Sequence, residues 1–465
     1  MHSRAGYARA PTALSPIVGL IVVIAFILLN PPRTPAQTTS IAGRIERAAA
    51  SIDGNRIEEA ERELVSVLKV RPNDPTALNL MGTIRAKQRR LNEAETLFLR
   101  AVTIDNRLSG ARMNLAYLYL LKGEQEKGAL QLREVLRLAP DNTDASYRLA
   151  WLLLSQGRYD ECIGVVDQAK RYGSASAPLL AVLGDALLKK GDVDGAESSY
   201  RSALGEQGNN ADAILGLALV AHFRGDANEV ALYLGRARSL TADSPDLLFK
   251  FAQVALSSEL AGEAIVALKR AIELRGDEPA YHFVLGVTWL QKPDLQEAEQ
   301  AFRQSLKLRE DDAQVQMYLG YTLLKQKKSP EARSWLEKSM RNDVSTPETF
   351  YYLGLIAQEQ GEDERAVGLF EKAIQLSPSF AHAHIALGST CLKMKNYPRA
   401  KQEIESGVRL NPDDSKAHYN LALLYTRLGD TQKAQEEMQI VERLKGSNVM
   451  TKDADTLTPP ALRPR

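Results

Sequence analysis

Histidines are the side chains of this sequence with the clearest capacity to hold a metal. Six occur, and His282, His384 and His418 are separated by multiples of 34 residues. With His382 beside them, the imidazole nitrogens allow a metal site. The alternative, which we favour, is that these rings fill one recurring packing slot of a repeated unit.

Cysteine chemistry is sparse. Cys162 and Cys391 form no CxxC pair and no disulfide framework. Both fall where other repeat units carry small apolar residues, which predicts buried, inert thiols. The sequence also lacks a Gly-rich phosphate loop, HExxH, GxSxG and an acidic calcium loop. We therefore expect no catalytic residues, no metal and no cofactor, and predict that the protein is not an enzyme.

Charge and composition narrow the possible partners. Lys plus Arg number 59 and Asp plus Glu 58, for a formal net charge of +1. This balance produces no field that would attract nucleic acid, so nucleic-acid binding is not expected. Hydrophobic residues make up 44% and charged residues 25% of the chain, close to ordinary soluble proteins, so a sizeable core is expected.

A period of 34 residues organises the chain from Ile41 onward. One row of small residues follows this period: Ala48, Gly82, Ala116, Ala150, Gly184, Ala218, Ala252, Gly286, Gly320, Gly354, Gly388 and Ala422. A second, mostly small row lies twelve residues further on: Ala60, Ala94, Gly128, Cys162, Ala196, Val230, Ala264, Ala298, Ala332, Ala366, Ala400 and Ala434. Twelve such units fill residues 41–448 without an insertion.

Each unit reads as a helical hairpin, because it contains two apolar stripes of helical period separated by a polar turn. A turn glycine, which suits a left-handed helix cap, occurs at Gly123, Gly157, Gly191, Gly225, Gly361 and Gly429. The two small rows allow the helix backbones to approach closely. One hairpin cannot bury its apolar face alone, so stacked hairpins must share a core. The pattern predicts an all-α solenoid of about twelve helix-turn-helix repeats.

The unit resembles the tetratricopeptide repeat (TPR). Residues 347–380 carry almost the whole family pattern in Leu353, Gly354, Gly361, Ala366, Phe370, Ala373 and Pro378. The resemblance covers residues 41–448 and implies a right-handed superhelix, in which the histidine slot often holds an aromatic ring. Some units depart from the pattern: Pro293 and Lys327 replace the turn glycine, Gly407 and Ser339 replace a late alanine, and the unit at 211–244 is irregular in its second helix.

The resemblance also implies that the first helix of each unit lines a concave groove. The fifth and ninth residues of the units place an aromatic strip there: Tyr117, Tyr147, Trp151, Phe249, Phe283, Tyr321, Tyr351 and Tyr419. A long exposed apolar strip indicates partner binding. The alternative is that neighbouring helices cover the strip and it is ordinary core. The carboxylate clamp of chaperone-binding members is not expected, because Asn114, Arg148, Lys250 and Asn420 lie at nearby positions but do not assemble the clamp set of Lys, Asn and Arg in successive units.

The two ends of the chain differ from the repeats. Residues 1–40 begin with Arg4 and Arg9, and residues 17–29 form an uninterrupted apolar run, IVGLIVVIAFILL. This run suits a signal peptide cleaved before Gln37, and counted from Ala13 it reaches the lower limit of a membrane span. Membrane contact is expected only through residues 13–29, if they are retained. Residues 449–465 are polar and proline-containing, which predicts a disordered tail.

Together these features predict an exported or membrane-anchored bacterial TPR protein. The leading hypothesis is a non-catalytic scaffold, periplasmic or anchored in the inner membrane, that binds an extended peptide or helix of a partner protein in its groove. The alternative is a regulatory or assembly subunit of a separately encoded enzyme, such as a glycosyltransferase or polysaccharide-export complex. Fold alone does not determine function, so the partner is left open.

Overall fold

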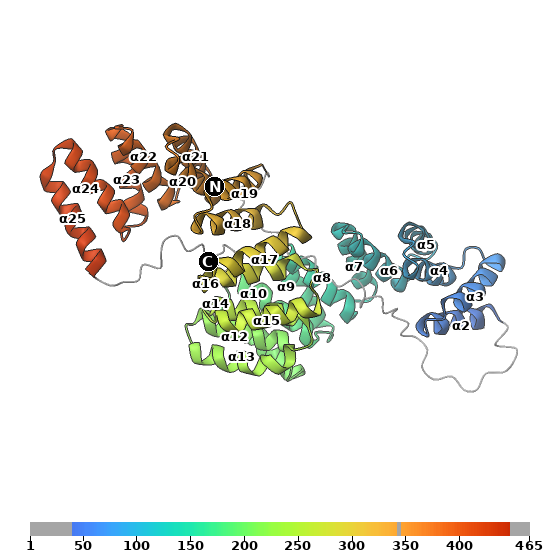
Figure 1. The fold of residues 1–465 in the computed structure, drawn as a ribbon. Helices are drawn as coiled ribbons and strands as arrows, with labels where there is room; N and C mark the ends of the chain where they lie inside the picture. Colours follow the sequence, from blue (N-terminus) through green and yellow to red (C-terminus); the bar gives the residue numbers. More distant parts are fainter. Residues whose placement is uncertain (1–39, 342–345, 447–465) are drawn as a thin grey trace. The chain divides into compact units, whose positions relative to one another are not determined.

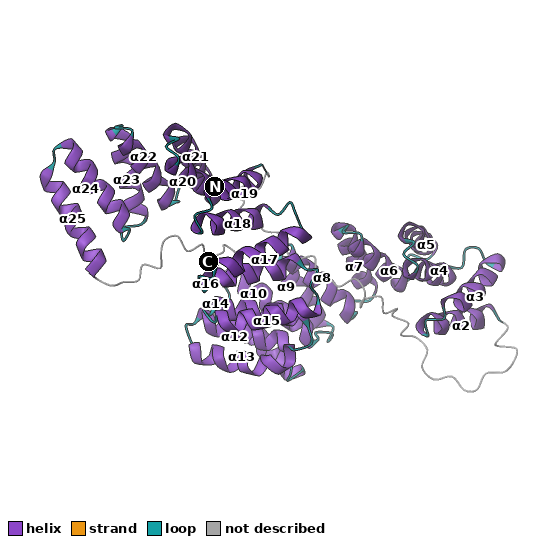
Figure 2. Cartoon of the chain, in the orientation of Figure 1, coloured by secondary structure: helices purple, strands orange, loops and turns teal. Residues whose placement is uncertain are grey.

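The computed structural model of the protein describes residues 40–341 and 346–446, which form 24 helices and contain no strand (Figures 1 and 2). The first helices of the repeats are α2 (Ile41–Asp53), α4 (Pro75–Lys87), α6 (Ser109–Leu121), α8 (Thr143–Ser155), α10 (Ala177–Lys189), α12 (Ala211–Phe223), α14 (Pro245–Ser257), α16 (Pro279–Gln291), α18 (Ala313–Lys325), α20 (Pro347–Glu359), α22 (Ala381–Lys393) and α24 (Ser415–Leu428). The second helices are α3 (Ile57–Val70), α5 (Leu91–Ile104), α7 (Gln125–Leu138), α9 (Tyr159–Arg171), α11 (Val193–Glu206), α13 (Ala227–Thr241), α15 (Ala261–Leu274), α17 (Leu295–Leu308), α19 (Ser329–Met340), α21 (Asp363–Leu376), α23 (Tyr397–Leu410) and α25 (Thr431–Gly446). The predicted all-α solenoid of twelve helix pairs is confirmed.

Ten of the twelve first helices begin where the sequence provides a side-chain cap or a proline, and α6 and α22 begin without either. The side chain of Asp74 accepts a hydrogen bond from the Ala77 amide at 3.0 Å, and Asn142 accepts one from Ala145 at 2.8 Å. Such caps satisfy amide groups that have no partner within the helix. Pro245 begins α14 and therefore costs no hydrogen bond.

The turns between paired helices have the left-handed backbone that their glycines predict. All six turn glycines have φ between 73° and 85°. Where glycine is replaced, the backbone still turns through positive φ, with 21° at Pro293 and 62° at Lys327. The helix hairpin therefore imposes this conformation even on residues that prefer another region.

Close approach of paired helices explains the first row of small residues. A Cβ added to Gly354 would lie 2.4 Å from the Phe370 ring, and one added to Gly286 would lie 2.6 Å from the Phe302 ring. Where the row carries alanine, as at Ala252, the opposing residue is a smaller aliphatic side chain, here Leu268. Glycine in this row makes room for an aromatic ring on the second helix of the same repeat at Gly82, Gly184, Gly286 and Gly354, and for Leu336 and Ile404 at Gly320 and Gly388.

The two departures from the late alanine have separate structural reasons. The Ser339 hydroxyl donates a hydrogen bond to the Ala313 carbonyl oxygen at 2.8 Å, which joins the second helix to the start of the first helix. A Cβ on Gly407 would lie 2.4 Å from Ile385, so the smaller residue is needed there. Local packing changes in these repeats while the helix pairs persist.

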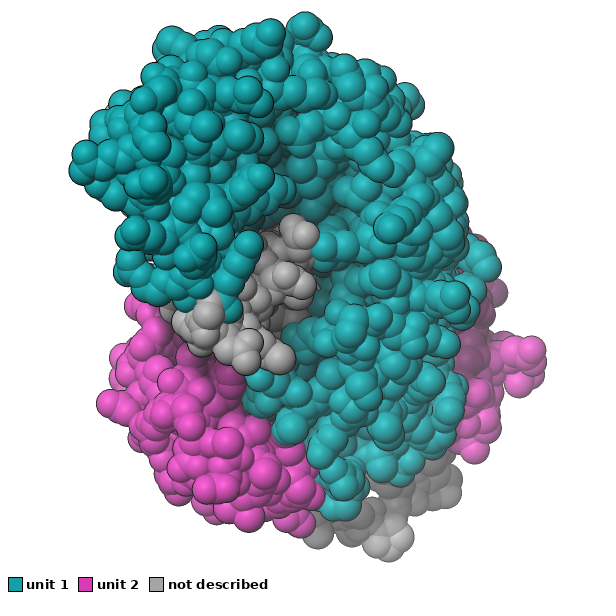
Figure 3. Space-filling view, turned by 60° about the vertical axis from the view of Figure 1, so that its left-hand side comes forward, with its two compact units in different colours: residues 1–7, 238–465 teal, residues 8–237 magenta. Residues whose placement is uncertain are grey.

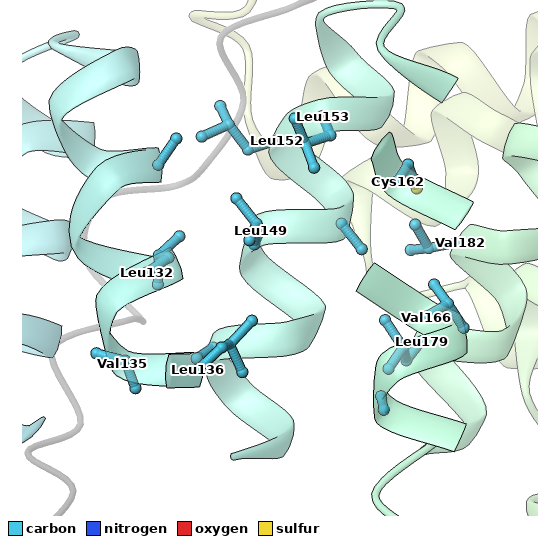
Figure 4. Packing of buried hydrophobic residues seen from close by; sticks show 14 of the residues in the cluster. Leu132, Val135, Leu136, Leu149, Leu152, Leu153, Cys162, Val166, Leu179 and Val182 are labelled. Atoms are coloured by element: carbon cyan, nitrogen blue, oxygen red, sulfur yellow. The ribbon is translucent and has the colours of Figure 1, made fainter. Parts of the chain in front are cut away.

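The described chain divides into two compact units, residues 40–237 and residues 238–446 (Figure 3). Within each unit, a second helix packs on the first helix of its own repeat and on the first helix of the next, as α5 packs on α4 and α6 in one unit and α21 packs on α20 and α22 in the other. The core is therefore a row of layers, one for each repeat. Figure 4 shows the layer of α7 to α10, where Leu149 and Leu153 lie among Leu132, Val166 and Leu179.

The predicted signal or anchor and the predicted disordered tail lie outside the described residues. Among the helices of residues 40–341 and 346–446, none has the length and apolar character needed to span a bilayer. The unit at 211–244, expected to be irregular, forms two helices, α12 and α13.

Candidate partner-binding surface

The first helices of successive repeats contact one another within each unit, as α4 contacts α6 and α20 contacts α22. This row of helices carries the aromatic residues that the sequence places at the fifth and ninth positions. We call the surface formed by the fifth and ninth residues of the first helices, together with their polar neighbours, the first-helix face. Its chemistry differs along the chain.

In residues 40–237, the first-helix face combines half-buried rings with charged groups. Tyr117, Tyr147 and Trp151 are partly exposed and pack against the apolar layer of α6 to α10. The hydroxyl of Tyr117 on α6 donates a hydrogen bond to Asp144 on α8. Arg148 donates to Asp144 at 2.9 Å and lies over the Tyr117 ring, 4.3 Å from its centre.

This arrangement ties two successive first helices together while leaving ring surface accessible. Burial, with a further contribution from Asp144, raises the pKa of Tyr117, so the phenol remains a neutral donor at physiological pH. The Asp144 carboxylate and the Arg148 guanidinium largely compensate each other. The surface therefore offers aromatic area and hydrogen-bonding groups without a strong local charge.

A polar cluster beside these rings was not anticipated from the sequence. Asn114 on α6 donates to the Asn79 side-chain oxygen at 2.9 Å and contacts the Thr83 hydroxyl at 3.4 Å, both on α4. The sequence feature that could have revealed this cluster is the spacing of 35 residues between Asn79 and Asn114, one more than the repeat period. A residue at the sixth position of one repeat therefore faces the fifth and ninth positions of the preceding repeat.

In residues 238–446, two of the predicted aromatic residues are deeply packed. Tyr321 is only 6% exposed and Tyr351 only 7% exposed. Tyr321 stacks on Tyr352 of the next repeat with ring centres 5.1 Å apart, and Tyr351 lies 5.2 Å from Phe380. These two predicted groove residues are core residues in the structure, because Tyr352 of the next repeat covers Tyr321, and Phe380, the residue before α22, covers Tyr351.

The other predicted residues of this unit remain partly or largely accessible. Phe249 and Phe283 are half-buried and stack on Tyr281 and Tyr318 at 5.0 and 5.4 Å. Tyr419 on α24 is 50% exposed. The predicted strip is therefore interrupted by buried rings and is not uniformly exposed.

The histidines occupy a packing slot, as favoured from the sequence. His282, His384 and His418 each place Nε2 within 3.2 Å of the carbonyl oxygen six residues earlier. His384 and His418 also place Nδ1 at 2.7 and 2.6 Å from Glu403 and Glu437 of their own repeats. These side chains join a first helix to the preceding turn and to its own second helix.

The two cysteines are buried, as predicted. Burial raises the pKa of Cys162 to about 12 and also raises the pKa of Cys391, so neither thiol ionises readily. Within residues 40–341 and 346–446, no group of three or more His, Cys, Asp or Glu side chains is arranged to hold a metal. A cavity of about 450 Å³ is lined by Leu149, Leu153, Arg133, Glu161 and their neighbours.

Comparison with known proteins agrees with the repeat pattern. Models described as tetratricopeptide repeat match residues 42–108, 249–313, 297–343, 357–418 and 404–436, and a tetratricopeptide repeat-like domain matches residues 108–221. Together these matches span most of residues 42–436.

The chain is also similar to two curated proteins. Cellulose synthase 1 operon protein C of Komagataeibacter xylinus is 26% identical over 209 residues, which are 45% of this chain and 14% of that protein. Cellulose synthase operon protein C of Xanthomonas axonopodis pv. citri (strain 306) is 27% identical over 203 residues, 44% of this chain and 12% of that protein. The chain thus matches only a small part of each relative's length.

The solved structures to which the chain is similar include the Cut9–Hcn1 hetero-tetramer of APC/C, with a TM-score of 0.46, 14% identity, and coverage of 90% of this chain and 96% of that chain. A tetratricopeptide repeat protein from Parabacteroides merdae ATCC 43184 has a TM-score of 0.45 and 18% identity, with coverage of 53% and 98%. The repeat pattern, the helix pairs and the family matches agree: the chain belongs to the tetratricopeptide-repeat family.

Proposed function

We propose that this protein is a non-catalytic scaffold that binds an extended peptide or a helix of a partner protein on the first-helix face of residues 40–237. The supporting observation is the cluster of Tyr117, Tyr147 and Trp151, whose rings are half-buried yet retain accessible surface. Rigid aromatic side chains provide contact area at low entropic cost, and they are common in the energetic centres of interfaces.

The neighbouring polar groups suit the recognition of a peptide. Asn114, Asp144 and Arg148 lie on the same helices as the rings and are already held by hydrogen bonds, Asn114 to Asn79 and Arg148 to Asp144. Their pre-organised donors and acceptors could pair with a peptide backbone without further ordering of the side chains. A net charge near zero favours a contact dominated by ring burial over one dominated by ionic attraction.

The second part of the proposal concerns location and context. We infer that the apolar run at residues 17–29 exports or anchors the chain, so that the repeats act in the bacterial envelope. A role as an assembly or regulatory subunit of a separately encoded enzyme is the second candidate. The similarity to two cellulose synthase operon proteins over 44–45% of the chain favours that candidate and supports a polysaccharide-synthesis or export complex as the setting.

Affinity capture from solubilised membranes tests the scaffold function. The full-length chain and its Trp151→Leu variant are used as baits, and captured proteins are quantified by mass spectrometry. Leucine retains much of the packing of Trp151 and removes the ring, so at least one captured protein should fall by tenfold or more. That decrease corresponds to about 1.4 kcal/mol of binding free energy.

A matched control separates recognition from folding. Asp167→Ala changes an exposed residue on α9 of the same repeat and should leave capture unchanged. Capture should also persist in moderate salt, because ring burial is weakly screened. Equal capture by wild type and Trp151→Leu, or loss of all capture in moderate salt, would show that this face does not bind through its rings.

A further inference from the structure

The last described repeat has an apolar face whose counterpart in the two preceding repeats is largely buried. Tyr419 and Leu423 on α24 and Met438 on α25 are 50%, 36% and 37% exposed. With Ala434 they border a hollow of about 340 Å³. We call Tyr419, Leu423, Ala434 and Met438 the end face.

The positions of Met438 and Tyr419 are buried in the two preceding repeats, whereas the position of Leu423 holds the partly exposed Ser389 and Leu355. Ile404 and Phe370, one and two repeats before Met438, have no exposed surface. Ile385 and Tyr351, at the position of Tyr419, are also buried. The sequence at the end face therefore retains the apolar character of an internal repeat junction.

The structure identifies what covers these positions elsewhere. Tyr351 is covered by Phe380, the residue that precedes α22, and by His382 of α22, with ring centres 5.2 and 6.3 Å away. Its helix α20 and the following α21 both pack against α22. The end face is thus complementary to a single helix that packs on α24 and α25 as α22 packs on α20 and α21.

A head-to-tail second copy of this chain fits poorly in that place. In every other first helix the seventh residue is Leu, Met or Phe, and it packs against the preceding repeat, as Leu115 packs with Phe98 of α5 and Leu149 packs with Leu132 of α7. The corresponding residue of α2 is Arg47, preceded by Glu46, so stacking α2 on the end face would bury charged groups. Burying charge is costly unless it is fully paired.

We propose that the end face is a second docking site, for a single amphipathic α-helix of a partner protein. The helix binds as the first helix of a further repeat would, with apolar residues three and four positions apart directed at Tyr419, Leu423 and Met438. This site is separate from the aromatic cluster of residues 40–237. It gives the scaffold a capacity to hold two partners.

A peptide that carries α22 serves as the probe, because α22 covers a junction with Tyr351 and Leu355 at the positions of Tyr419 and Leu423. A fluorescent synthetic peptide of residues 378–396, with serine in place of Cys391, is titrated with the full-length protein and followed by anisotropy. We expect saturable binding. Leu423→Asp should weaken it at least tenfold, and Met438→Gln should also weaken it.

Leu308→Asp is the matched control, since Leu308 is similarly exposed, at 42%, but lies on α17. It should bind the peptide as the wild type does. Trp151→Leu should also bind normally, so failure of this test and failure of the scaffold function are distinguishable. Circular dichroism verifies that each variant remains helical.

Three results would overturn the proposal. The first is absence of saturable binding, or equal binding by Leu423→Asp. The second is a dimer in sedimentation equilibrium that Leu423→Asp disperses, which would assign the end face to a second copy. The third is binding that appears only in a variant ending at residue 446, which would assign the end face to residues 447–465 of the same chain.

Discussion

Substitution of Gly354 by alanine tests whether close helix approach determines the small-residue row. A Cβ at this position would lie 2.4 to 2.9 Å from three carbon atoms of the Phe370 ring. Phe370 is fully buried, so its ring cannot move aside into solvent. The added methyl group must therefore separate α20 from α21 or force the ring out of its preferred rotamer.

Two opposing effects determine the magnitude. Overpacking a core by one methyl group typically costs about 1–3 kcal/mol. Alanine in a helix interior is favoured over glycine by about 1 kcal/mol. Because all three contacts are shorter than any that real Cβ atoms tolerate, we expect the upper end of the cost, and a net destabilisation of about 2 kcal/mol.

Gly368→Ala is the control, since a Cβ at Gly368 on α21 would meet no atom within 4 Å. It should stabilise the same repeat by about 0.5–1 kcal/mol through helix propensity alone. The double variant Gly354→Ala/Phe370→Leu recreates the pair that the chain already contains at Ala252 and Leu268. It should be more stable than the sum of the single effects predicts, with a coupling of about 1 kcal/mol or more.

Hydrogen–deuterium exchange by mass spectrometry is the suitable assay, because long repeat arrays do not unfold in one cooperative step. A local loss of about 2 kcal/mol corresponds to roughly thirtyfold faster exchange of the protected amides in α20 and α21. If Gly354→Ala slows exchange as Gly368→Ala should, or if the double variant is additive, the small-residue row does not reflect helix contact.

Three further predictions use the same assay. The Nδ1–H bond to Glu403, opposed by burial and by Arg409, raises the pKa of His384. The stabilisation that protonated His384 provides is therefore complete below about pH 6.5 and is lost as the pH rises through the folded-state pKa. Exchange in α22 and α23 should accelerate over that range, and His384→Gln should abolish this dependence. Lys327→Gly should stabilise the α18–α19 turn by about 0.5–1 kcal/mol, because φ there is +62°, and faster exchange in this variant would contradict the explanation. Tyr351→Ala should destabilise α20 to α22 by about 3 kcal/mol, because Tyr351 is a core residue. A change below about 1 kcal/mol would show instead that Tyr351 belongs to the accessible surface.

Much of the fold follows from the sequence because its determinants are local and recur twelve times. The turn glycines predict the left-handed backbone, and the structure has positive φ at all six. The rows of small residues predict close helix pairs, and the packing of Gly354 against Phe370 agrees. Each of these features depends on residues within one hairpin, so a period of 34 residues is sufficient to reveal it.

The exposure of the aromatic residues could not be predicted from the 34-residue period of the sequence. Tyr351 and Tyr419 share the fifth position of their repeats, yet one is 7% and the other 50% exposed. The difference lies in the next helix, because Phe380 and α22 cover Tyr351 while α25 is followed by no described helix. The position of a residue within its repeat specifies the direction in which its side chain points. Burial depends on the presence and size of the neighbouring residue that contacts this side chain, and only the tertiary structure supplies that neighbour.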